Sequence, residues 1–322
     1  MQGRNGGTGL TLALLSAATF AMSGPLAKAL IEAGWSPAAA VTARIATAAL
    51  VLTVPALLQL RTAARGALRR GAGPVLAYGV VAVAGCQLAF FNAVQHVSVG
   101  VALMLEYLGS ILVVLWMWAR HGQRPRRLTV AGAGAAVLGL LLVLDISGSS
   151  HLDPIGVAWG LVAAFGLAAY FLLSARTDTA LPPIPMAWAS MVVGTGMLIG
   201  FGAAGVVPMA ATTADVRLLG HGASWLVPVA GLAVVAAVIP YVAGIGAARL
   251  LGAKVASFVG LTEVLFAVLF AWLMLGQLPG PVQLVGGAFI VAGVAMVRVD
   301  ELRAPQHRPE PLPHAAAEAV AG

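Results

Sequence analysis

Residues 118–125 read WARHGQRP, and residues 272–279, 154 positions later, read WLMLGQLP. Around these two turns, residues 93–143 align with residues 247–297 without a gap, and 13 of the 51 pairs are identical. Many matches arise from composition alone in a chain rich in alanine, valine, leucine and glycine. Composition alone does not explain a tryptophan, a Gly-Gln pair and a proline that all recur at the same offset of 154 residues. Each copy predicts an apolar helix, a turn and a second apolar helix, so the sequence contains an internal duplication.

The composition predicts a membrane protein. Of 322 residues, 60% are hydrophobic and 9% are charged, and no soluble domain buries that much apolar sequence. The formal charge of +7 comes from basic residues between apolar stretches, where they act as topology signals, so we expect no nucleic-acid partner. The single cysteine, Cys86, excludes an intrachain disulfide and a cysteine-based metal cluster, and we expect it to serve helix packing.

Ten apolar stretches approach the roughly 20 residues that cross a hydrocarbon core. The predicted fold is therefore an all-α membrane protein with ten transmembrane helices joined mostly by short turns. A polar segment, 208–224, is predicted to form a loop. We expect 1–7 to be a cytoplasmic N-terminus and 300–322 to be a disordered cytoplasmic tail. The predicted spans are 8–31, 38–60, 73–93, 98–119, 128–146, 155–174, 185–207, 225–247, 254–275 and 280–299.

Basic residues predict the orientation of these spans. If both termini are cytoplasmic, fifteen of the eighteen lysines and arginines fall on the inner side, as the positive-inside rule requires. The expected localisation is the cell membrane, with multiple spans. The fifteen are Arg4, Arg61, Arg65, Arg69, Arg70, Arg120, Arg124, Arg126, Arg127, Arg176, Arg249, Lys254, Arg298, Arg303 and Arg308.

The duplication and the charges together predict two inverted repeats. The aligned copies are separated by five spans, an odd number, so they cross the membrane in opposite senses. The turn at 120–127 is strongly basic, whereas the equivalent turn at 275–281 has no charge and is expected outside. We assign the first five-helix repeat to 8–147 and the second to 155–299. Such repeats are typical of transporters that bind substrate near the midplane.

Two acidic residues fall near the middle of spans four and nine. Glu106 and Glu263 should each face a partner or a water-filled cavity, because an ionised carboxylate at that depth costs at least about 2.5 kcal/mol. In the repeat alignment Glu263 pairs with Gly109, one helical turn from Glu106, so both acids lie on similar faces of equivalent helices. We interpret them as substrate-binding and proton-coupling residues. The alternative is that they form structural ion pairs between helices.

A third charged residue, Arg44, lies about two turns inside span two, too deep for easy snorkelling. It either grips a substrate carboxylate through its planar fork or pairs permanently with Glu106. We expect Glu106 to carry most of the proton coupling and Glu263 less, since Glu263 has no evident cationic partner in its own repeat.

Other polar and aromatic residues are candidates for the same pocket. In span three, Gln87, Phe91 and Asn92 belong to a polar-aromatic stripe that lines the pocket or forms helix–helix hydrogen bonds. Tyr107 and Tyr241 are assigned to the substrate site. Proline at position 240 should free backbone carbonyls and allow a kink. Small residues on spans five and ten favour close contact between repeats or between protomers of a homodimer: Gly132, Gly134, Gly139, Gly286, Gly287 and Gly293.

The sequence resembles the EamA-type members of the drug/metabolite transporter superfamily over essentially all of 8–299. Within the superfamily it is most similar to the threonine/homoserine exporters. Besides the repeated helix–Gly-Gln-x-Pro–helix unit, the resemblance is carried by Leu26-Ala27-Lys28, Val41-Thr42-Ala43-Arg44, Tyr78-Gly79-Val80, Val101-Ala102-Leu103, Leu105-Glu106-Tyr107-Leu108-Gly109, Ile239-Pro240-Tyr241 and Ala247-Ala248-Arg249-Leu250.

The chain departs from the family pattern at two places where helices are expected to bend. Relatives often have proline after the glycine of span four and after the glutamate of span nine, where this chain has Ser110 and Val264. The turns usually end Gly-Glu, but here they end Gly-Gln. The missing prolines put helix kinking in question, though not the fold.

The resemblance implies a secondary transporter that exports amino acids or similar small polar metabolites. Family membership alone leaves a multidrug exporter as an alternative, and a lipid-handling membrane enzyme or scaffold is the alternative from another class. Enzyme motifs such as H-E-x-x-H, Walker A and G-x-S-x-G do not occur, so we expect no enzyme and no cofactor. The expected partners are a small polar metabolite and membrane lipids.

Overall fold

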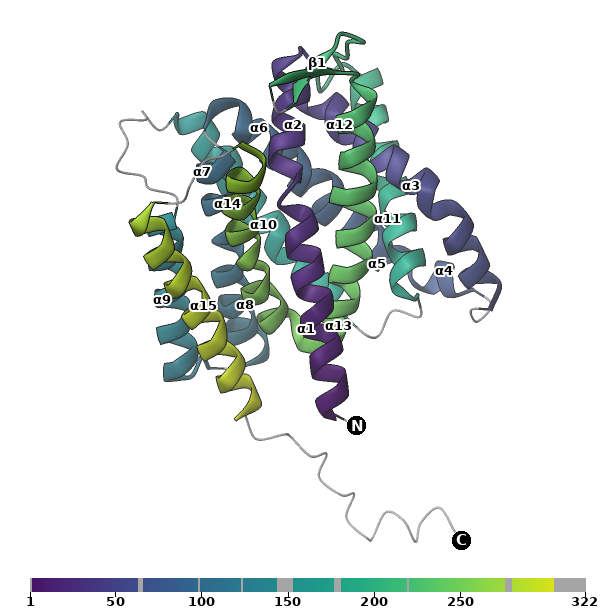
Figure 1. The fold of residues 1–322 in the computed structure, drawn as a ribbon. Coiled ribbons are helices and arrows are strands. Elements are labelled where there is room, and N and C mark those ends of the chain that lie inside the picture. The colour runs from purple at the N-terminus through teal and green to yellow at the C-terminus, as the bar shows by residue number, and fades with distance from the viewer. Residues whose placement is uncertain are drawn as a thin grey trace, which may run out of the picture.

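The computed structural model describes residues 2–62, 66–97, 99–122, 124–143, 153–176, 181–218, 220–275 and 280–303. These residues form a helical bundle whose two ends, Gln2 and Arg303, lie at the same end of the molecule (Figure 1). Seven helices within these ranges are long and apolar enough to cross a membrane, and the helix at 127–142 is apolar but shorter. The structure therefore supports a protein with several membrane spans.

The first half of the chain supplies α1 Gln2–Phe20, α2 Ser23–Glu32, α3 Pro37–Thr62, α4 Ala67–Arg70, α5 Ala72–Ala77, the π-helix η1 Tyr78–Gly85, α6 Cys86–His96, α7 Val99–Tyr107, α8 Gly109–His121 and α9 Arg127–Val143. The second half supplies α10 Pro154–Ser174, α11 Pro183–Ala203, the strands β1 Val216–Leu218 and β2 His221–Ala223, α12 Leu226–Ala230, the π-helix η2 Gly231–Val238, α13 Ile239–Gly260, α14 Thr262–Leu275 and α15 Pro281–Leu302.

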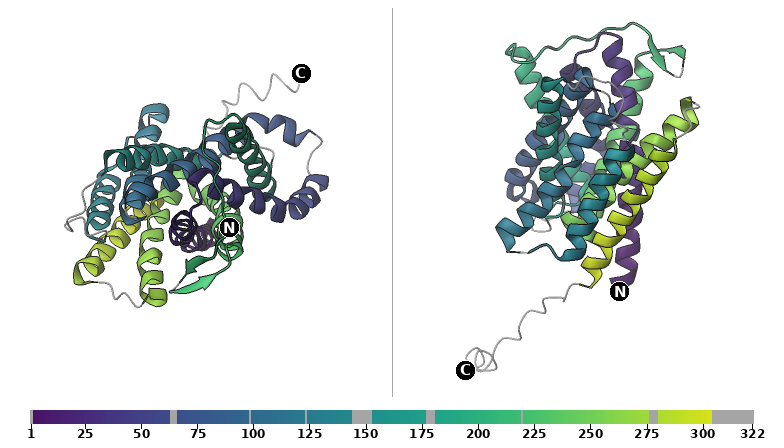
Figure 2. Two further views of the ribbon diagram at one scale, coloured as in Figure 1. Left: turned by 90° about the horizontal axis from the view of Figure 1, so that it is seen from above. Right: turned by 90° about the vertical axis from the view of Figure 1, so that its left-hand side faces the viewer.

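Equivalent helices of the two halves pack on one another in a pseudo-symmetric way. If the helices of each half are counted as predicted spans, the first span of one half packs against the third span of the other. Thus α1 packs on α13, and α10 packs on η1 and α6. The second helices, α3 and α11, pack together, as do the fifth, α9 and α15. Figure 2 shows α9 and α15 side by side in both views. This exchange of equivalent contacts is what a pseudo-two-fold axis between two repeats produces.

Glycines bring α9 and α15 into backbone contact, as the sequence predicts. A methyl group added to Gly132 would lie 2.8 Å from the carbonyl oxygen of Gly293, and one added to Gly139 would lie 2.6 Å from that of Gly286. From Gly132 to Gly139 the residue number rises by seven, whereas the contacted residue changes from Gly293 to Gly286 and its number falls by seven. The two helices therefore run antiparallel. The close contact thus joins the two halves of one chain.

Replacing Gly139 with alanine is expected to destabilise the fold by about 1–3 kcal/mol, the usual cost of overpacking a tight contact. The added methyl group would meet backbone atoms of α15, which do not move as a side chain does. Gly134→Ala is the matched control, because Gly134 lies on the same helix and has no atom within 4 Å of the added position. Thermal unfolding in detergent measures the difference, and equal unfolding temperatures for the two variants would contradict this packing.

Several sequence-based boundaries need correction. α1 begins at Gln2, so most of the predicted N-terminal segment 1–7 is helical, and α15 continues to Leu302, inside the predicted tail. Asp300 accounts for this extension because its buried side chain accepts a hydrogen bond from Thr129 and lies 4.0 Å from Arg126. The remainder of the predicted tail, from 304, and the predicted end of the first repeat at 147 lie outside the described residues.

The polar segment between α11 and α12 is also more ordered than expected. It forms a small antiparallel hairpin, with Val216 opposite Ala223, which adds two strands to a fold predicted as all-α. The segment is tied to the start of α3, because Ser36 donates to the carbonyl oxygen of Pro208 at 2.7 Å and Trp35 donates to that of Thr212 at 2.9 Å.

Helix interruptions occur where the sequence gives no proline. α7 and α8 meet at Leu108, and α13 and α14 meet at Leu261, almost equivalent positions in the two halves. Absence of the family prolines therefore does not give continuous helices. Pro240 is the second residue of α13, directly after the π-helix η2, so the helix changes its form at this proline. The break within α13 lies at Gly252, whose φ of 79° and ψ of 160° separate 239–251 from 253–260.

Candidate functional site

Arg44 is the centre of a buried polar cluster. Its side chain, about two turns from the start of α3, has no exposed surface. The guanidinium group donates hydrogen bonds to Ser23 Oγ at 2.8 Å, to Gln87 Oε1 and to the carbonyl oxygen of Ala236. These partners come from α2, α6 and η2, so one side chain connects both halves of the chain.

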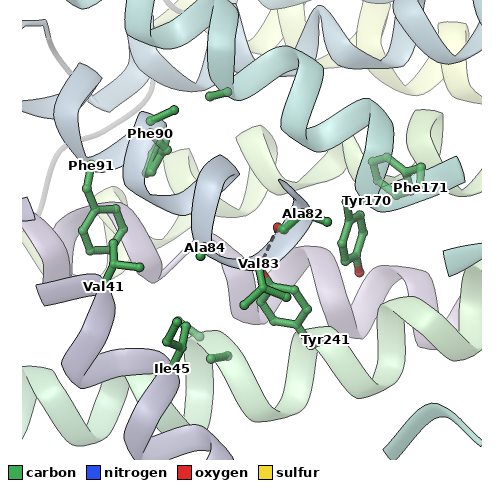
Figure 3. Close-up of a cluster of buried hydrophobic side chains, with 14 of the residues drawn as sticks. Val41, Ile45, Ala82, Val83, Ala84, Phe90, Phe91, Tyr170, Phe171 and Tyr241 are labelled. Atoms are coloured by element: carbon green, nitrogen blue, oxygen red, sulfur yellow. Dashed lines mark hydrogen bonds between the residues drawn. The ribbon is translucent and has the colours of Figure 1, made fainter. Parts of the chain in front are cut away.

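Two aromatic rings enclose the same guanidinium. Its central carbon lies 5.9 Å from the ring centroid of Phe20 and 5.8 Å from that of Phe91. Figure 3 places Phe91 beside Val41, a neighbour of Arg44 on α3. Arginine is attracted to the faces of aromatic rings at such distances, so these rings hold the cation without supplying a negative charge.

Backbone carbonyls at equivalent positions complete the cluster. Pro240 has no N–H, so the carbonyl of Ala236, four residues earlier, lacks its usual helical donor and accepts from Arg44 instead. Ala82 lies 154 positions before Ala236 in η1, and its carbonyl accepts from the Tyr241 hydroxyl at 3.3 Å (Figure 3). The prediction that Pro240 frees a backbone carbonyl is confirmed, and the acceptors are a matched pair from the two halves.

Arg44 and Glu106 do not form the permanent ion pair that was one of the two alternatives for Arg44. Among the described residues, no carboxylate lies within 4.0 Å of the Arg44 guanidinium, although Glu106 and Glu263 interact with it electrostatically at longer range. Arg44 Nε is buried, and no described residue forms a hydrogen bond with it. A buried cation held only by neutral groups is incompletely neutralised, which makes this cluster suited to an anionic group.

Glu263 lines a neighbouring pocket between α1, α10, α13 and α14. The pocket is narrow, with about 30 Å³ open to the centre of a water molecule. The Tyr107 hydroxyl donates to Glu263 Oε2 at 2.6 Å, so these two predicted site residues lie together. Phe20 belongs to both places, since it lines this pocket and flanks Arg44. Phe20 therefore connects the Arg44 cluster with the pocket that contains the Glu263 carboxylate.

Glu106 is buried outside this pocket. Its carboxylate accepts a weak hydrogen bond from the Cys86 thiol at 3.4 Å, and it is absent from the residues lining the Glu263 pocket. Cys86 is in close contact with α10, because a methyl group on Gly166 would lie 2.5 Å from its Cβ. Cys86 therefore packs helices as predicted, and it also serves as the polar partner of Glu106.

The other predicted site residues fall into two groups. Gln87 and Phe91 join the Arg44 cluster, and Tyr241 belongs to an adjoining aromatic group in which its ring centroid lies 5.3 Å from Phe20. Asn92 does not join, because its side chain donates to the carbonyl of Leu88 in its own helix. Sequence reasoning missed Phe20 and Ser23, because neither stands out from the apolar and small residues around it.

One polar contact links the two halves outside the candidate site. Asp153 caps α10 by accepting from the Ile155 N–H at 2.9 Å, and its other oxygen lies 2.8 Å from His96 Nδ1. The backbone N–H of Ile155 and the neighbouring His96 lower the pKa of Asp153 below its usual value. Asp153 therefore has a capping and linking role.

Comparisons with known proteins agree with these features. The model of the EamA-like transporter family matches residues 7–145 and 154–299. The threonine/homoserine exporter RhtA of Escherichia coli is 30% identical over 225 residues, 69% of this chain and 70% of RhtA. The inner membrane transporter YicL of Salmonella typhimurium is 22% identical over 237 residues, 73% of this chain and 76% of YicL. A protein of known crystal structure, 16% identical, superposes with a TM-score of 0.73 over 94% of this chain and 99% of its own.

Proposed function

Because the chain belongs to the EamA-like transporter family, a family of membrane transporters, we propose that it exports amino acids or similar small polar metabolites by secondary active transport. The observation that carries this proposal is the buried Arg44, whose described partners are all neutral. A substrate carboxylate would supply the missing anion through a planar, two-pronged contact. The likeness to RhtA, a threonine/homoserine exporter, supports amino acids as the substrate class.

The proposed substrate site combines the two neighbouring places. Arg44, Gln87 and Phe91 would hold the carboxylate, and Glu263 with Tyr107 would hold the ammonium group on the other side of Phe20. Tyr241 belongs to the edge of the proposed site, Asn92 is left out of it because its side chain is bonded within its own helix, and Glu106 and Glu263 are the proposed proton carriers of an antiport cycle. Intramembrane charges commonly mark such pathways.

The pocket composition favours a small substrate over a bulky hydrophobic one. Four of the thirteen residues that line the Glu263 pocket are aromatic, and most of the others are alanine, glycine or serine. A multidrug exporter, the second candidate within the superfamily, is typically expected to present a mainly aromatic surface to its substrates. The pocket is narrow in this structure, which favours a compact substrate over a bulky one.

Counterflow in proteoliposomes tests the proposed function. Vesicles preloaded with unlabelled threonine are expected to accumulate labelled threonine, and Arg44→Ala vesicles are not. The same assay with other amino acids and with hydrophobic cations such as ethidium defines the class of substrate that is transported. Transport of hydrophobic cations without counterflow of any amino acid would overturn the proposal and favour the multidrug alternative. A lipid-handling enzyme or scaffold predicts counterflow of neither.

We also propose ten spans with both termini cytoplasmic, divided into repeats at 8–147 and 155–299, with a homodimer as a further proposal for the assembly. The orientation has a direct test in a variant lacking Cys86. A membrane-impermeant thiol reagent added to intact cells should label Gly280→Cys but not Gln123→Cys, because the basic turn is expected inside and the uncharged one outside. The reverse labelling pattern would show that the orientation is inverted.

A further inference from the structure

A long groove runs along the side of the molecule, away from the candidate substrate site. It lies between α8, α10 and the turn at Gly252, and encloses about 2060 Å³ of space including its open mouth. Its elements can be followed at the lower left of Figure 1. The groove is lined by Leu112, Leu115, Trp116, Met117, Ala119, Arg120, Phe165, Ala168, Ala169, Leu172, Leu173, Ala175, Arg176, Gly252 and Ala253.

The groove has the depth of one membrane leaflet. The lining runs from Phe165 on α10 to Arg176, two residues beyond the end of that helix. These eleven steps cover roughly 16 Å at 1.5 Å per residue. That length is about half of a hydrocarbon core of roughly 30 Å. It opens sideways to the surroundings, since Phe165 is 66% exposed and Leu115 is 47% exposed. The acyl chain of a lipid has the length and the apolar character that match this surface.

The charge of the groove is confined to one end. Arg120 lies in the last turn of α8, and Arg176 lies two residues after the end of α10. Both side chains are exposed. Among the residues that the structure describes, no acidic one lines the groove, and the other members of the lining are apolar or small. Basic groups next to an apolar membrane surface attract anionic headgroups. We propose that this groove binds an anionic phospholipid, with the headgroup phosphate at Arg120 and Arg176 and one acyl chain along α10.

The substrate is a poorer occupant of the same groove. α10 separates the two places, because Leu167, Tyr170 and Phe171 face the Glu263 pocket, whereas Ala168, Ala169 and Leu172 face the groove. A small polar metabolite would gain nothing from an apolar wall one leaflet deep. A lipid there would also touch both halves of the chain, since α8 belongs to the first and α10 to the second.

Fluorescence quenching in nanodiscs tests the proposal. The discs contain mainly phosphatidylcholine with a few per cent of a lipid brominated in its acyl chains, either phosphatidylglycerol or phosphatidylcholine. Trp116 lines the groove, and its signal is the difference between the protein and Trp116→Phe. We expect brominated phosphatidylglycerol to quench that signal several-fold more than brominated phosphatidylcholine. Trp118 is 47% exposed but outside the groove, so the Trp118 signal should show no preference.

Arginine variants decide whether charge at the groove causes this preference. Arg120→Gln is expected to weaken the preference for the anionic lipid about fivefold, the effect of one basic residue near a charged surface. The exposed Arg124 lies in the adjoining turn outside the groove, so Arg124→Gln should keep it. Equal quenching of Trp116 by both lipids, or a full preference in Arg120→Gln, would overturn the proposal. Relief of quenching by added threonine would instead assign the groove to the substrate.

Discussion

Arg44→Lys is expected to lower substrate affinity roughly 10- to 150-fold while leaving a folded protein. Lysine keeps the charge but loses the planar fork that reaches several acceptors at once. Hydrogen bonds to charged groups each contribute about 1.5–3 kcal/mol, which converts to that range of affinity. The measurement is the substrate-dependent shift in thermal unfolding, with counterflow as the second readout and size-exclusion chromatography as the check on folding.

A second substitution distinguishes substrate binding from a structural role. Gln87 already contacts Arg44, so Gln87→Glu would place a carboxylate beside the guanidinium. We expect this variant to be at least as stable as the parent but to bind substrate less tightly, because its own carboxylate competes for Arg44. If Arg44→Lys transports normally and Gln87→Glu leaves affinity unchanged, then Arg44 is a structural residue and the proposed carboxylate site is wrong.

The other large effect is expected at Glu263. Glu263→Gln is nearly isosteric and permanently neutral, so it should lose at least tenfold of the transport driven by an imposed pH gradient. Counterflow should fall less, because Arg44 still binds the substrate carboxylate. The sequence favoured Glu106 for this role because Glu263 has no evident cationic partner in its own repeat. The structure instead puts Glu263 at the pocket, in contact with the Tyr107 hydroxyl, and encloses Glu106 against Cys86.

Two comparison variants accompany this measurement. Glu106→Gln is expected to reduce gradient-driven transport less than Glu263→Gln. Tyr107→Phe removes the hydrogen bond to Glu263 without removing the carboxylate, so it should alter the pH at which transport is half-maximal and keep the response to the gradient. A Glu263→Gln protein that responds fully to an imposed pH gradient would exclude proton coupling through this residue.

The architecture was largely predictable from the sequence because it depends on long-range patterns. Apolar stretches of about 20 residues, a duplicated turn and repeated glycines each leave a signal that spans many residues. The glycine contact between α9 and α15 was therefore predicted. Arg44 was identified for a similar reason, since a single charge in an apolar stretch is conspicuous.

The details of the site were not predictable, and the reasons are physical. A helix that is apolar on all faces has no periodicity to show whether it turns every 3.6 residues or more slowly, so η1 and η2 left no signal. The partners of Arg44 depend on which side chains from distant helices reach it. Ser23, Phe20 and the carbonyl of Ala236 look ordinary in sequence, and only their packing makes them part of the cluster.

The two π-helices carry information about ancestry. A wide helical turn arises when one residue is inserted into an ordinary helix, and here it occurs at Tyr78–Gly85 and at Gly231–Val238, an offset of 153 against the 154 that aligns the repeated turns. Two independent insertions at one place in both halves would be a coincidence. The simpler history is that a single five-helix ancestor already contained the extra residue before its gene doubled. The wide turn is then older than the joined chain, and a stand-alone relative of half this length should contain it as well.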